Sequence, residues 1–274
     1  MADDLRDHLG IVRKLGRTPT PKGMLRGRGA TNIQDYRTAA GLPPLIPRSE
    51  WKPISFVQGA PTSLIEDQRQ YGSCSCATET GAQNRQRWMR GVPFVPLAWT
   101  WLYDQVNGGH DSGSNMGEVG SVARAQGVPP MSSYPDCQFR SGNNPAGVPY
   151  YREGVQEITF SSFDEYATGI LMGLCVQHAI DAGGRFESFD SSGVSKGQGG
   201  NANHSVYSAG LQQVNGAWVL ETVNSWTASW GPFGSGYCLT TERQLMNVAA
   251  EDDGVGHIVV LAPAGVQDAA PAPH

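Results

Sequence analysis

The stretch that most constrains this chain is Asp67–Trp88, which reads DQRQYGSCSCATETGAQNRQRW. Gly72 and Ser73 directly precede Cys74, and the residues after Cys74 can continue as a helix, so the pattern predicts a turn that leads into a helix N-terminus. Ser73 is a suitable cap there. Free N–H groups and the positive end of the helix dipole favour an anion, which eases ionisation of a thiol to the nucleophilic thiolate. The competing interpretation is that Cys74 is a small buried apolar residue.

Two cysteines compete for this role, because each has a Gln six residues before it. Gln68 precedes Cys74, and Gln70 precedes Cys76. Only Cys74 also follows Gly-Ser directly and has Asp-Gln at the matching distance. We therefore favour Cys74 as the nucleophile.

Composition narrows the class of protein. A chain of 274 residues can form one large domain or two fused lobes with a sizeable core. The 35 Gly and 18 Pro favour a loop-rich α+β enzyme over a helical bundle. A formal charge of −5 gives no reason to expect nucleic-acid binding. No apolar run approaches about 18 residues, so we expect no membrane span, and the N-terminal sequence lacks the apolar core of a secretory signal.

The five cysteines are an odd number and lack zinc-ligand spacing. One thiol is left over in any full pairing scheme, and we expect mostly reduced cysteines. The sequence leaves open the disulfide state of the four others, which are Cys76, Cys137, Cys175 and Cys238.

Residues 1–43 differ from the rest of the chain. They hold eight Lys and Arg against four Asp, a charge of +4, so the remainder carries −9. Residues 4–15 are expected to form a short amphipathic helix. The basic charge suits a pro-segment that inhibits the folded domain or an arm that docks on an acidic partner, and a solvated extension is an equal alternative.

The remaining chain predicts helices first and strands later. The Cys-bearing helix is expected to end near Gly91-Val-Pro93. Further helices are expected over 96–106, 118–126 and 164–174, and strands over 155–160, 176–181, 205–210, 217–223, 236–239 and 257–262. This order predicts a two-lobed α+β domain over 44–264 with a cleft between its lobes. The helical lobe would span about 60–135, the β lobe about 136–264 plus 44–59, and a flexible tail 265–274.

A thiolate nucleophile needs a base, a group that orients the base, and an oxyanion hole. His204 stands at the start of a predicted strand after the Gly-rich loop SKGQGGNAN, where its side chain can face a cleft. In VNSWTASWGPFGSGY, Asn224 can hold the far imidazole nitrogen and Trp226 can cover that hydrogen bond. The Gln68 amide can point, with the Cys74 N–H, at a developing oxyanion. A structural histidine and core tryptophans are the alternatives.

These motifs, in this order, resemble the papain-like cysteine peptidases (peptidase family C1). The matching elements are DQ-x₄-C with GSC, the Asn-His pair at 203–204, and NSW-x₃-WG-x₄-GY from Asn224 onward. The resemblance covers about residues 41–262, and PLAWTWLYDQ and DSGSN look most like the bacterial and phage branch. It implies a papain-like two-lobed α+β fold, with a helical lobe around a central Cys-bearing helix, a β-barrel-like lobe and an active-site cleft between them.

The resemblance also implies the catalytic roles. Cys74 would be the nucleophile, and His204 its ion-pair partner and general acid/base. Asn224 would orient His204, and Gln68 would complete the oxyanion hole. About 3–4 Å is the expected separation of the Cys74 sulfur from a His204 ring nitrogen.

Substrate-binding roles follow in the same way. Gly113 and Ser114 would lie where the family pairs its backbone with substrate. Met116 and Asn203 would border the pocket for the side chain next to the cleaved residue. Trp226 would shield the Asn–His pair.

Three positions depart from the family pattern. Ser75 stands where a Trp usually follows the nucleophile, Tyr71 replaces a Cys that commonly forms the first disulfide, and Ser114 replaces a Gly. These changes affect the expected disulfides and substrate pocket more than the catalytic set.

The expected function is therefore a cysteine endopeptidase that hydrolyses an extended peptide through a thiolate–imidazolium pair and an acyl-enzyme, with no metal or organic cofactor. One alternative is a structural or binding protein with this scaffold, such as a virion component. Another is a peptidoglycan peptide hydrolase that uses the same dyad. The expected partners are a peptide or protein substrate and a protein partner for the basic arm, and the expected location is cytoplasmic or virion-associated.

Overall fold

A computed structural model describes residues 4–6, 12–17, 31–152, 156–183, 185–251 and 256–260. Its helices are α1 (Ile33–Ala39), α2 (Cys74–Met89), α3 (Trp99–Val106), α4 (Met116–Gln126), α5 (Phe163–Leu171) and α6 (Glu242–Glu251). Its strands are β1 (Asp4–Arg6), β2 (Val12–Lys14), β3 (Thr31–Asn32), β4 (Ile54–Ser55), β5 (Gln156–Phe160), β6 (Val176–Ile180), β7 (His204–Val214), β8 (Ala217–Val223), β9 (Tyr237–Thr241) and β10 (Gly256–Val260). The predicted tail lies outside the described residues.

One sheet holds most of the strands. Its order is β3-β5-β10-β6-β7-β8-β9, and β4 pairs with β7. The pairs are antiparallel except β3–β5. A register shift between Ser208 and Leu211 marks a bulge in β7, and such a bulge bends the strand.

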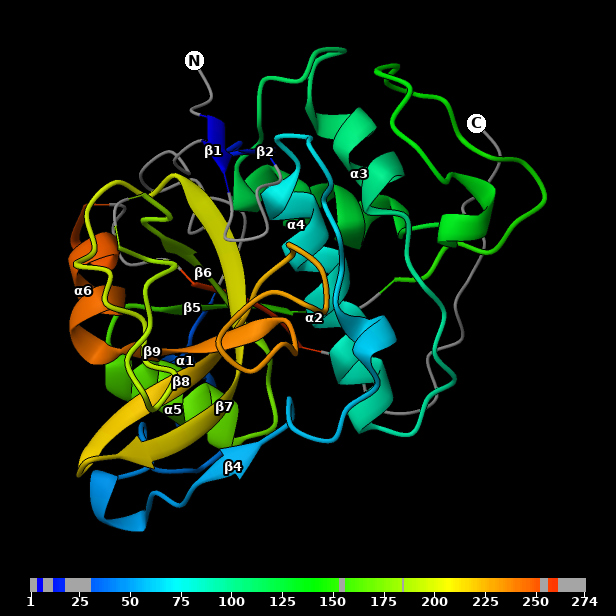
Figure 1. The fold of residues 1–274 in the computed structure, drawn as a ribbon. Helices are drawn as coiled ribbons and strands as arrows, with labels where there is room; N and C mark the ends of the chain where they lie inside the picture. The colour runs from blue at the N-terminus through cyan, green and yellow to red at the C-terminus, as the bar shows by residue number, and fades with distance from the viewer. Residues whose placement is uncertain are drawn as a thin grey trace.

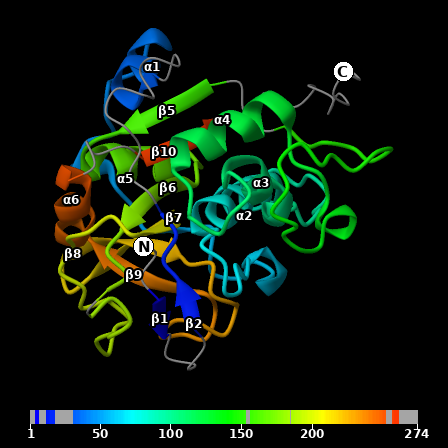
Figure 2. The same cartoon turned by 90° about the horizontal axis from the view of Figure 1, so that it is seen from above.

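The helices divide into two groups around this sheet. In Figure 1, α2, α3 and α4 lie together on one side of the molecule, and the strands with α1, α5 and α6 occupy the other side. Figure 2 shows the same grouping from above. We call the first group the helical side and the second the sheet side. Among the described residues, no helix is long and apolar enough to cross a membrane.

Helix α2 lies at the junction of the two sides, because it packs on β7 and β6 as well as on α3 and α4. Small residues allow the close approach: a Cβ at Gly81 would lie only 3.1 Å from the Tyr207 ring. The helix ends at Met89, and Gly91 follows with a φ of 70°, a conformation that glycine adopts without steric cost. Every residue from Cys74 to Arg87 is buried, as expected for a helix that is covered on several faces.

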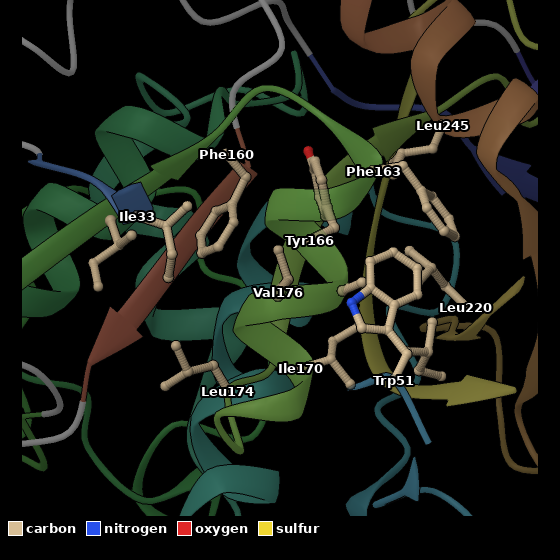
Figure 3. Close-up of a cluster of buried hydrophobic side chains, with 13 residues drawn as sticks. Ile33, Trp51, Phe160, Phe163, Tyr166, Ile170, Leu174, Val176, Leu220 and Leu245 are labelled. Atoms are coloured by element: carbon tan, nitrogen blue, oxygen red, sulfur yellow. The ribbon is translucent and has the colours of Figure 1, made fainter. Parts of the chain in front are cut away.

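The sheet side has its own apolar core. Phe160 of β5 and Val176 of β6 pack against Tyr166 and Ile170 of α5, as Figure 3 shows. Trp51 joins this cluster from the segment before β4. Ser162 caps α5 in a reciprocal capping box with Glu165, which fixes where the helix begins.

The prediction of a helix over residues 4–15 is wrong. β1 and β2 form an antiparallel pair in which Asp4 lies opposite Lys14. A short isolated helix is marginally stable in water, and residues 13–17 gain contacts with the folded domain as an extended segment. Tertiary contacts therefore override the weak helical pattern.

The predicted α+β class is confirmed, but the barrel-like expectation needs correction. In the described part of the chain, the sheet path runs from β3 to β9 and those two edge strands are not paired with each other. The sheet is therefore open rather than a closed barrel.

Candidate active site

Cys74 is the first residue of α2, at the junction of the helical side and the sheet side. The predicted Ser73 cap is wrong, because its side chain makes no capping bond and its buried Oγ has no hydrogen-bond partner. Burial raises the pKa of the Cys74 thiol, while backbone hydrogen bonds from Ser205 and Gly16 and the charge of Arg17 counteract that rise. Cys74 is therefore a neutral thiol at neutral pH in this structure.

His204 is the first residue of β7, and Asn224 follows the end of β8. The His204 Nε2 lies 2.8 Å from the Asn224 Oδ1. Because an amide oxygen only accepts, Nε2 carries the proton and Nδ1 is the free base. The Nδ1 atom is buried and has no hydrogen-bond partner among the described residues, the Cys74 thiol included.

Burial also governs the charge of His204. It lowers the pKa of the imidazole to about 4, the bond to Asn224 acts in the opposite direction, and the charge of Arg13 lowers the pKa further. The ring is therefore neutral near pH 7. The sequence predicted a thiolate–imidazolium pair, but in this structure Cys74 and His204 are both neutral, since burial disfavours both ions.

The first turn of α2 meets the start of β7, which brings Cys74 and His204 into one neighbourhood. The Ser75 Oγ lies 3.0 Å from the Ser205 Oγ and donates to the Ser114 carbonyl at 3.1 Å. The position where the family usually has Trp thus carries a buried serine that links β7 to the loop before α4.

Trp226 and Gln68 complete this cluster. The Trp226 ring lies over the His204 ring, with centroids 4.6 Å apart and planes tilted by 32°. The Gln68 Oε1 accepts hydrogen bonds from the Ser225 Oγ at 2.7 Å and from the Trp226 Nε1 at 3.2 Å. These bonds fix the amide so that its nitrogen faces away from Trp226.

Residues 13–17 run through the same site. The Gln68 Nε2 donates to the Lys14 carbonyl at 3.2 Å and to the Tyr71 carbonyl at 2.9 Å. The Ser114 N–H donates to the Gly16 carbonyl at 2.8 Å. A Cβ at Gly16 would overlap the Gly72 carbonyl, so the segment passes directly over the turn before Cys74.

The residues with predicted substrate-binding roles differ in whether they contact this segment. A Cβ at Gly113 would overlap the Gly16 carbonyl. The Asn203 carbonyl accepts from the Arg17 N–H at 3.4 Å, and the Asn203 side chain is held by Ala182 and Asp181. Met116 is buried at the start of α4.

Three basic side chains of the segment make contacts that the sequence analysis did not assign. Arg13 pairs with Asp67 at 2.6 Å, and Lys14 pairs with Asp111 at 2.6 Å. The Arg17 Nη1 donates to the Ala202 carbonyl at 2.7 Å, and burial lowers the pKa of Arg17 to about 10. The only sequence signal was the opposite charge of residues 1–43 and the remainder.

The competing thiol, Cys76, points elsewhere. It belongs to the apolar core of the helical side together with Trp99 and Leu102. Its sulfur lies 3.8 Å from the Ser114 Oγ, and burial raises its pKa well above the usual range. All five cysteines are free thiols, and no group of three or more His, Cys, Asp or Glu among the described residues is placed to hold a metal.

Several solved structures share this architecture. The proform of the Amb a 11 cysteine protease, a ragweed pollen allergen, has a TM-score of 0.67 and 18% identity over 92% of this chain and 77% of that chain. Bromelain from Ananas comosus, in complex with the inhibitor E64, has a TM-score of 0.61 and 18% identity over 79% and 100%. Procathepsin L 3 of the Tenebrio molitor larval midgut has a TM-score of 0.56 and 19% identity over 76% and 73%. At these identities the likeness concerns the fold.

A search of curated proteins found no match. The family model described as papain family cysteine protease matches residues 57–254. That range includes Cys74, His204 and Asn224 and more than half of the chain. The chain therefore belongs to the papain family of cysteine proteases.

Proposed function

We propose that this protein is a cysteine endopeptidase in which Cys74 is the nucleophile, His204 the general acid/base and Asn224 the residue that orients the imidazole. The observation that best supports this proposal is the peptide of residues 13–17 in the site. Its Lys14 carbonyl accepts a hydrogen bond from the Gln68 amide, and a substrate carbonyl would need the same donor.

In the proposed reaction, His204 Nδ1 takes the proton of the Cys74 thiol while the sulfur attacks the scissile carbonyl. Nε2 keeps its bond to Asn224, which holds the ring in the tautomer that leaves Nδ1 basic. Gln68 Nε2 and the Cys74 N–H would stabilise the oxyanion. His204 then protonates the leaving amine, and water, with His204 as base, hydrolyses the acyl-enzyme. The expected approach of the sulfur to a ring nitrogen stays a prediction.

Substrate would lie along the path of residues 13–17. Gly113 and Ser114 would pair with its backbone, since the Ser114 N–H donates to the Gly16 carbonyl. Met116 and Asn203 would border the pocket for the side chain next to the cleaved residue, and Trp226 would keep water from the Asn–His bond.

We further propose that residues 13–17 block the site in the full chain. The acyl part of a substrate, which precedes the scissile carbonyl, would pair with Gly113 and Ser114. In this segment the order is opposite, because Lys14 at the Gln68 amide precedes Gly16 at Ser114. Arg17 and Ser114 also form an isolated parallel β-bridge. A reversed peptide fills the cleft without presenting a productive carbonyl.

A labelling experiment tests both parts. A Cβ at Gly16 would overlap the backbone of Gly72, so Gly16→Ala should drive the segment out of the cleft. We expect a peptidyl epoxide to label Cys74 about tenfold faster in Gly16→Ala than in the unchanged chain. Val12→Ala is the matched control, because Val12 directly precedes the segment and has an exposed side chain.

The outcomes are separable by mass spectrometry of the labelled site. Equal rates in the unchanged chain and in Gly16→Ala would end the blocking proposal. Labelling spread over several thiols of Gly16→Ala, or peptide hydrolysis that survives Cys74→Ala, would end the peptidase assignment. Loss of both label and hydrolysis would favour a structural or binding protein, such as a virion component.

A comparison of substrates distinguishes the endopeptidase from the alternative of a peptidoglycan peptide hydrolase. Release of peptides from casein but not from peptidoglycan by Gly16→Ala supports the endopeptidase, and the reverse supports a peptidoglycan peptide hydrolase. The nearer resemblance to the bacterial and phage branch, and a cytoplasmic or virion-associated location, stay predictions of the sequence.

A further inference from the structure

The Arg13 side chain occupies a seat formed by three oxygen acceptors. Its Nη1 lies 2.6 Å from the Asp67 Oδ1 and 3.0 Å from the Arg69 carbonyl. Its Nη2 lies 3.5 Å from the Trp226 carbonyl. Arg13 is only 1% exposed. A carboxylate and two carbonyls that converge on one buried guanidinium form a site with clear selectivity for a cation.

The seat is held in place by the protein around it. The Asp67 Oδ1 also accepts the Arg69 N–H at 2.9 Å, and Asp67 pairs with Trp226 in an isolated antiparallel bridge. Arg69 has a φ of 56°. A residue with a side chain adopts this left-handed conformation at a cost and often at functional sites. The turn places the Arg69 carbonyl and the Asp67 carboxylate on the same guanidinium.

The seat also has a defined place relative to the chemistry. Gln68, whose amide holds the Lys14 carbonyl, lies between Asp67 and Arg69 in sequence. Ser114 and Asn203 form hydrogen bonds with the other end of the segment, and Gly113 lies against it. Since the acyl part of a substrate would bind at that other end, Arg13 marks the leaving-group side of the cleft.

There is room beside the guanidinium for the backbone of a longer peptide. A hollow of about 330 Å³ adjoins Arg13 and is also lined by Gln70, Tyr71 and Asp136. The charge outside residues 1–43 is −9, which attracts basic peptides over a longer range.

We propose that Asp67, with the Arg69 and Trp226 carbonyls, forms a substrate subsite for an arginine on the leaving-group side of the scissile bond, and that Arg13 fills this subsite in the blocked chain. The inference rests on the proposed peptidase function and adds the substrate class. Arginine is preferred over lysine, because both terminal nitrogens of Arg13 find acceptors and an ammonium cannot reproduce that fork.

The test is a cleavage profile of the full chain that carries Gly16→Ala. The enzyme digests a peptide library, and mass spectrometry reads which residues follow each cut. We expect arginine to be enriched at one of the first three positions after the cut. A substrate with arginine there should have a kcat/KM at least about tenfold above that of the same peptide with citrulline in place of this arginine. The citrulline comparison needs no change in the subsite, so it does not depend on how a variant folds.

Asp67→Asn removes the charge but keeps an oxygen for the Arg69 N–H. We expect this variant to lose the arginine enrichment, so that the ratio of kcat/KM for the arginine peptide to that for the citrulline peptide falls from about tenfold to near one. Asp190→Asn is the control with the same change in charge, because Asp190 is exposed and only its Oδ1 holds a turn at Ser192 and Val194.

Failure of the inference and failure of the proposed function look different. Cleavage without arginine enrichment, or enrichment that survives Asp67→Asn, overturns the subsite and leaves the peptidase intact. No cleavage of any peptide overturns the peptidase. In that case fluorescence anisotropy with the same arginine and citrulline peptides still decides whether the Asp67 seat binds a peptide guanidinium: equal binding of the two peptides rejects the seat.

Discussion

Two buried histidines on neighbouring strands, His178 of β6 and His204 of β7, differ in their hydrogen bonds although they are buried to the same degree. Their exposed fractions are 1% and 0%. Burial lowers the pKa of each imidazole to about 4. β6 and β7 are paired antiparallel, so the two rings belong to the same part of the sheet.

The ring nitrogens distinguish them. The His178 Nδ1 lies 3.2 Å from the Ala179 carbonyl, and its Nε2 lies 2.8 Å from the Ser208 Oγ. The Ser208 hydroxyl continues to Thr222 at 3.0 Å, and Thr222 continues to Thr240 at 2.6 Å. His178 is thus the end of a buried polar chain that crosses four strands, and neither ring nitrogen is left over.

His204 uses only one ring nitrogen. Its Nδ1 has no partner among the described residues. Leaving a buried polar atom unpaired costs about 1–3 kcal/mol, so such atoms are rare and are often found where chemistry is done. The comparison teaches that burial and a lowered pKa do not separate the two histidines, whereas an unused ring nitrogen does, and it is His204 that has the free nitrogen the proposed general base needs.

Replacing each histidine with alanine tests the distinction between His204 and His178 most strongly. In the Gly16→Ala chain, His204→Ala should lower kcat/KM for a peptide substrate about 10³-fold, because the general base is lost. His178→Ala should leave kcat/KM of the folded enzyme within a few-fold. It should lower the free energy of unfolding by about 2 kcal/mol, since the Ser208 hydroxyl loses its hydrogen bond to the ring and keeps only the bond to Thr222.

Guanidinium unfolding and peptide hydrolysis on the same samples separate the two effects. A large loss of activity in His178→Ala at full stability would contradict the assignment. So would an active His204→Ala enzyme.

The pH dependence of stability should sharpen the comparison. Both imidazoles have a pKa of about 4 in the folded protein, against 6.5 for the solvent-exposed group in the unfolded chain. Between these two pKa values the unfolded chain binds more protons than the folded chain. The contribution of the neutral imidazoles to the free energy of unfolding is therefore complete above pH 6.5 and is lost as the pH drops towards 4. Each histidine should account for up to about 3 kcal/mol of that loss.

Denaturant unfolding at several pH values between 7 and 4.5 measures this loss. The difference between the unchanged chain and His178→Asn isolates the share of His178 from the carboxylates that titrate in the same range. In Gly16→Ala the share of His204 should shrink, because water reaches its ring and the Arg13 charge leaves. The share of His178 should shrink less, because burial is the largest cause of its lowered pKa and the Arg17 charge the smallest, and because Tyr166 still packs on its ring with centroids 5.8 Å apart. Equal shrinkage of both shares would contradict the distinction.

The smallest effect concerns the polar chain behind His178. Ser208→Ala removes the hydroxyl that bonds to Nε2, and we expect a loss of about 1–2 kcal/mol in the free energy of unfolding with unchanged catalysis. Ser191→Ala is the control, because Ser191 is exposed, and it should change the stability by less than about 0.5 kcal/mol. An unchanged stability in Ser208→Ala would show that the chain of hydroxyls is not what satisfies His178.

Local patterns predicted much of the fold. The strand expected over 217–223 has those bounds in the structure, and the helix that begins at Cys74 ends two residues before Gly91. Periodicity and turn residues carry this information because they act over a few positions. Helix α6 was missed, and the helix expected over residues 4–15 was wrong, because a weak helical pattern is decided by what the segment packs against.

The candidate site divides in the same way. The sequence by itself determined which residue types are available and their order: Gly-Ser-Cys before a helix, His at a strand start, and Asn-Ser-Trp after a strand. Only the tertiary structure decided how Arg13 meets Asp67 across 54 positions, which nitrogen of His204 stays unpaired, and that Cys74 and His204 are both neutral beneath residues 13–17. The physical reason is that charge state and hydrogen-bond partners depend on desolvation and on contacts between distant segments, and neither is written in a local pattern.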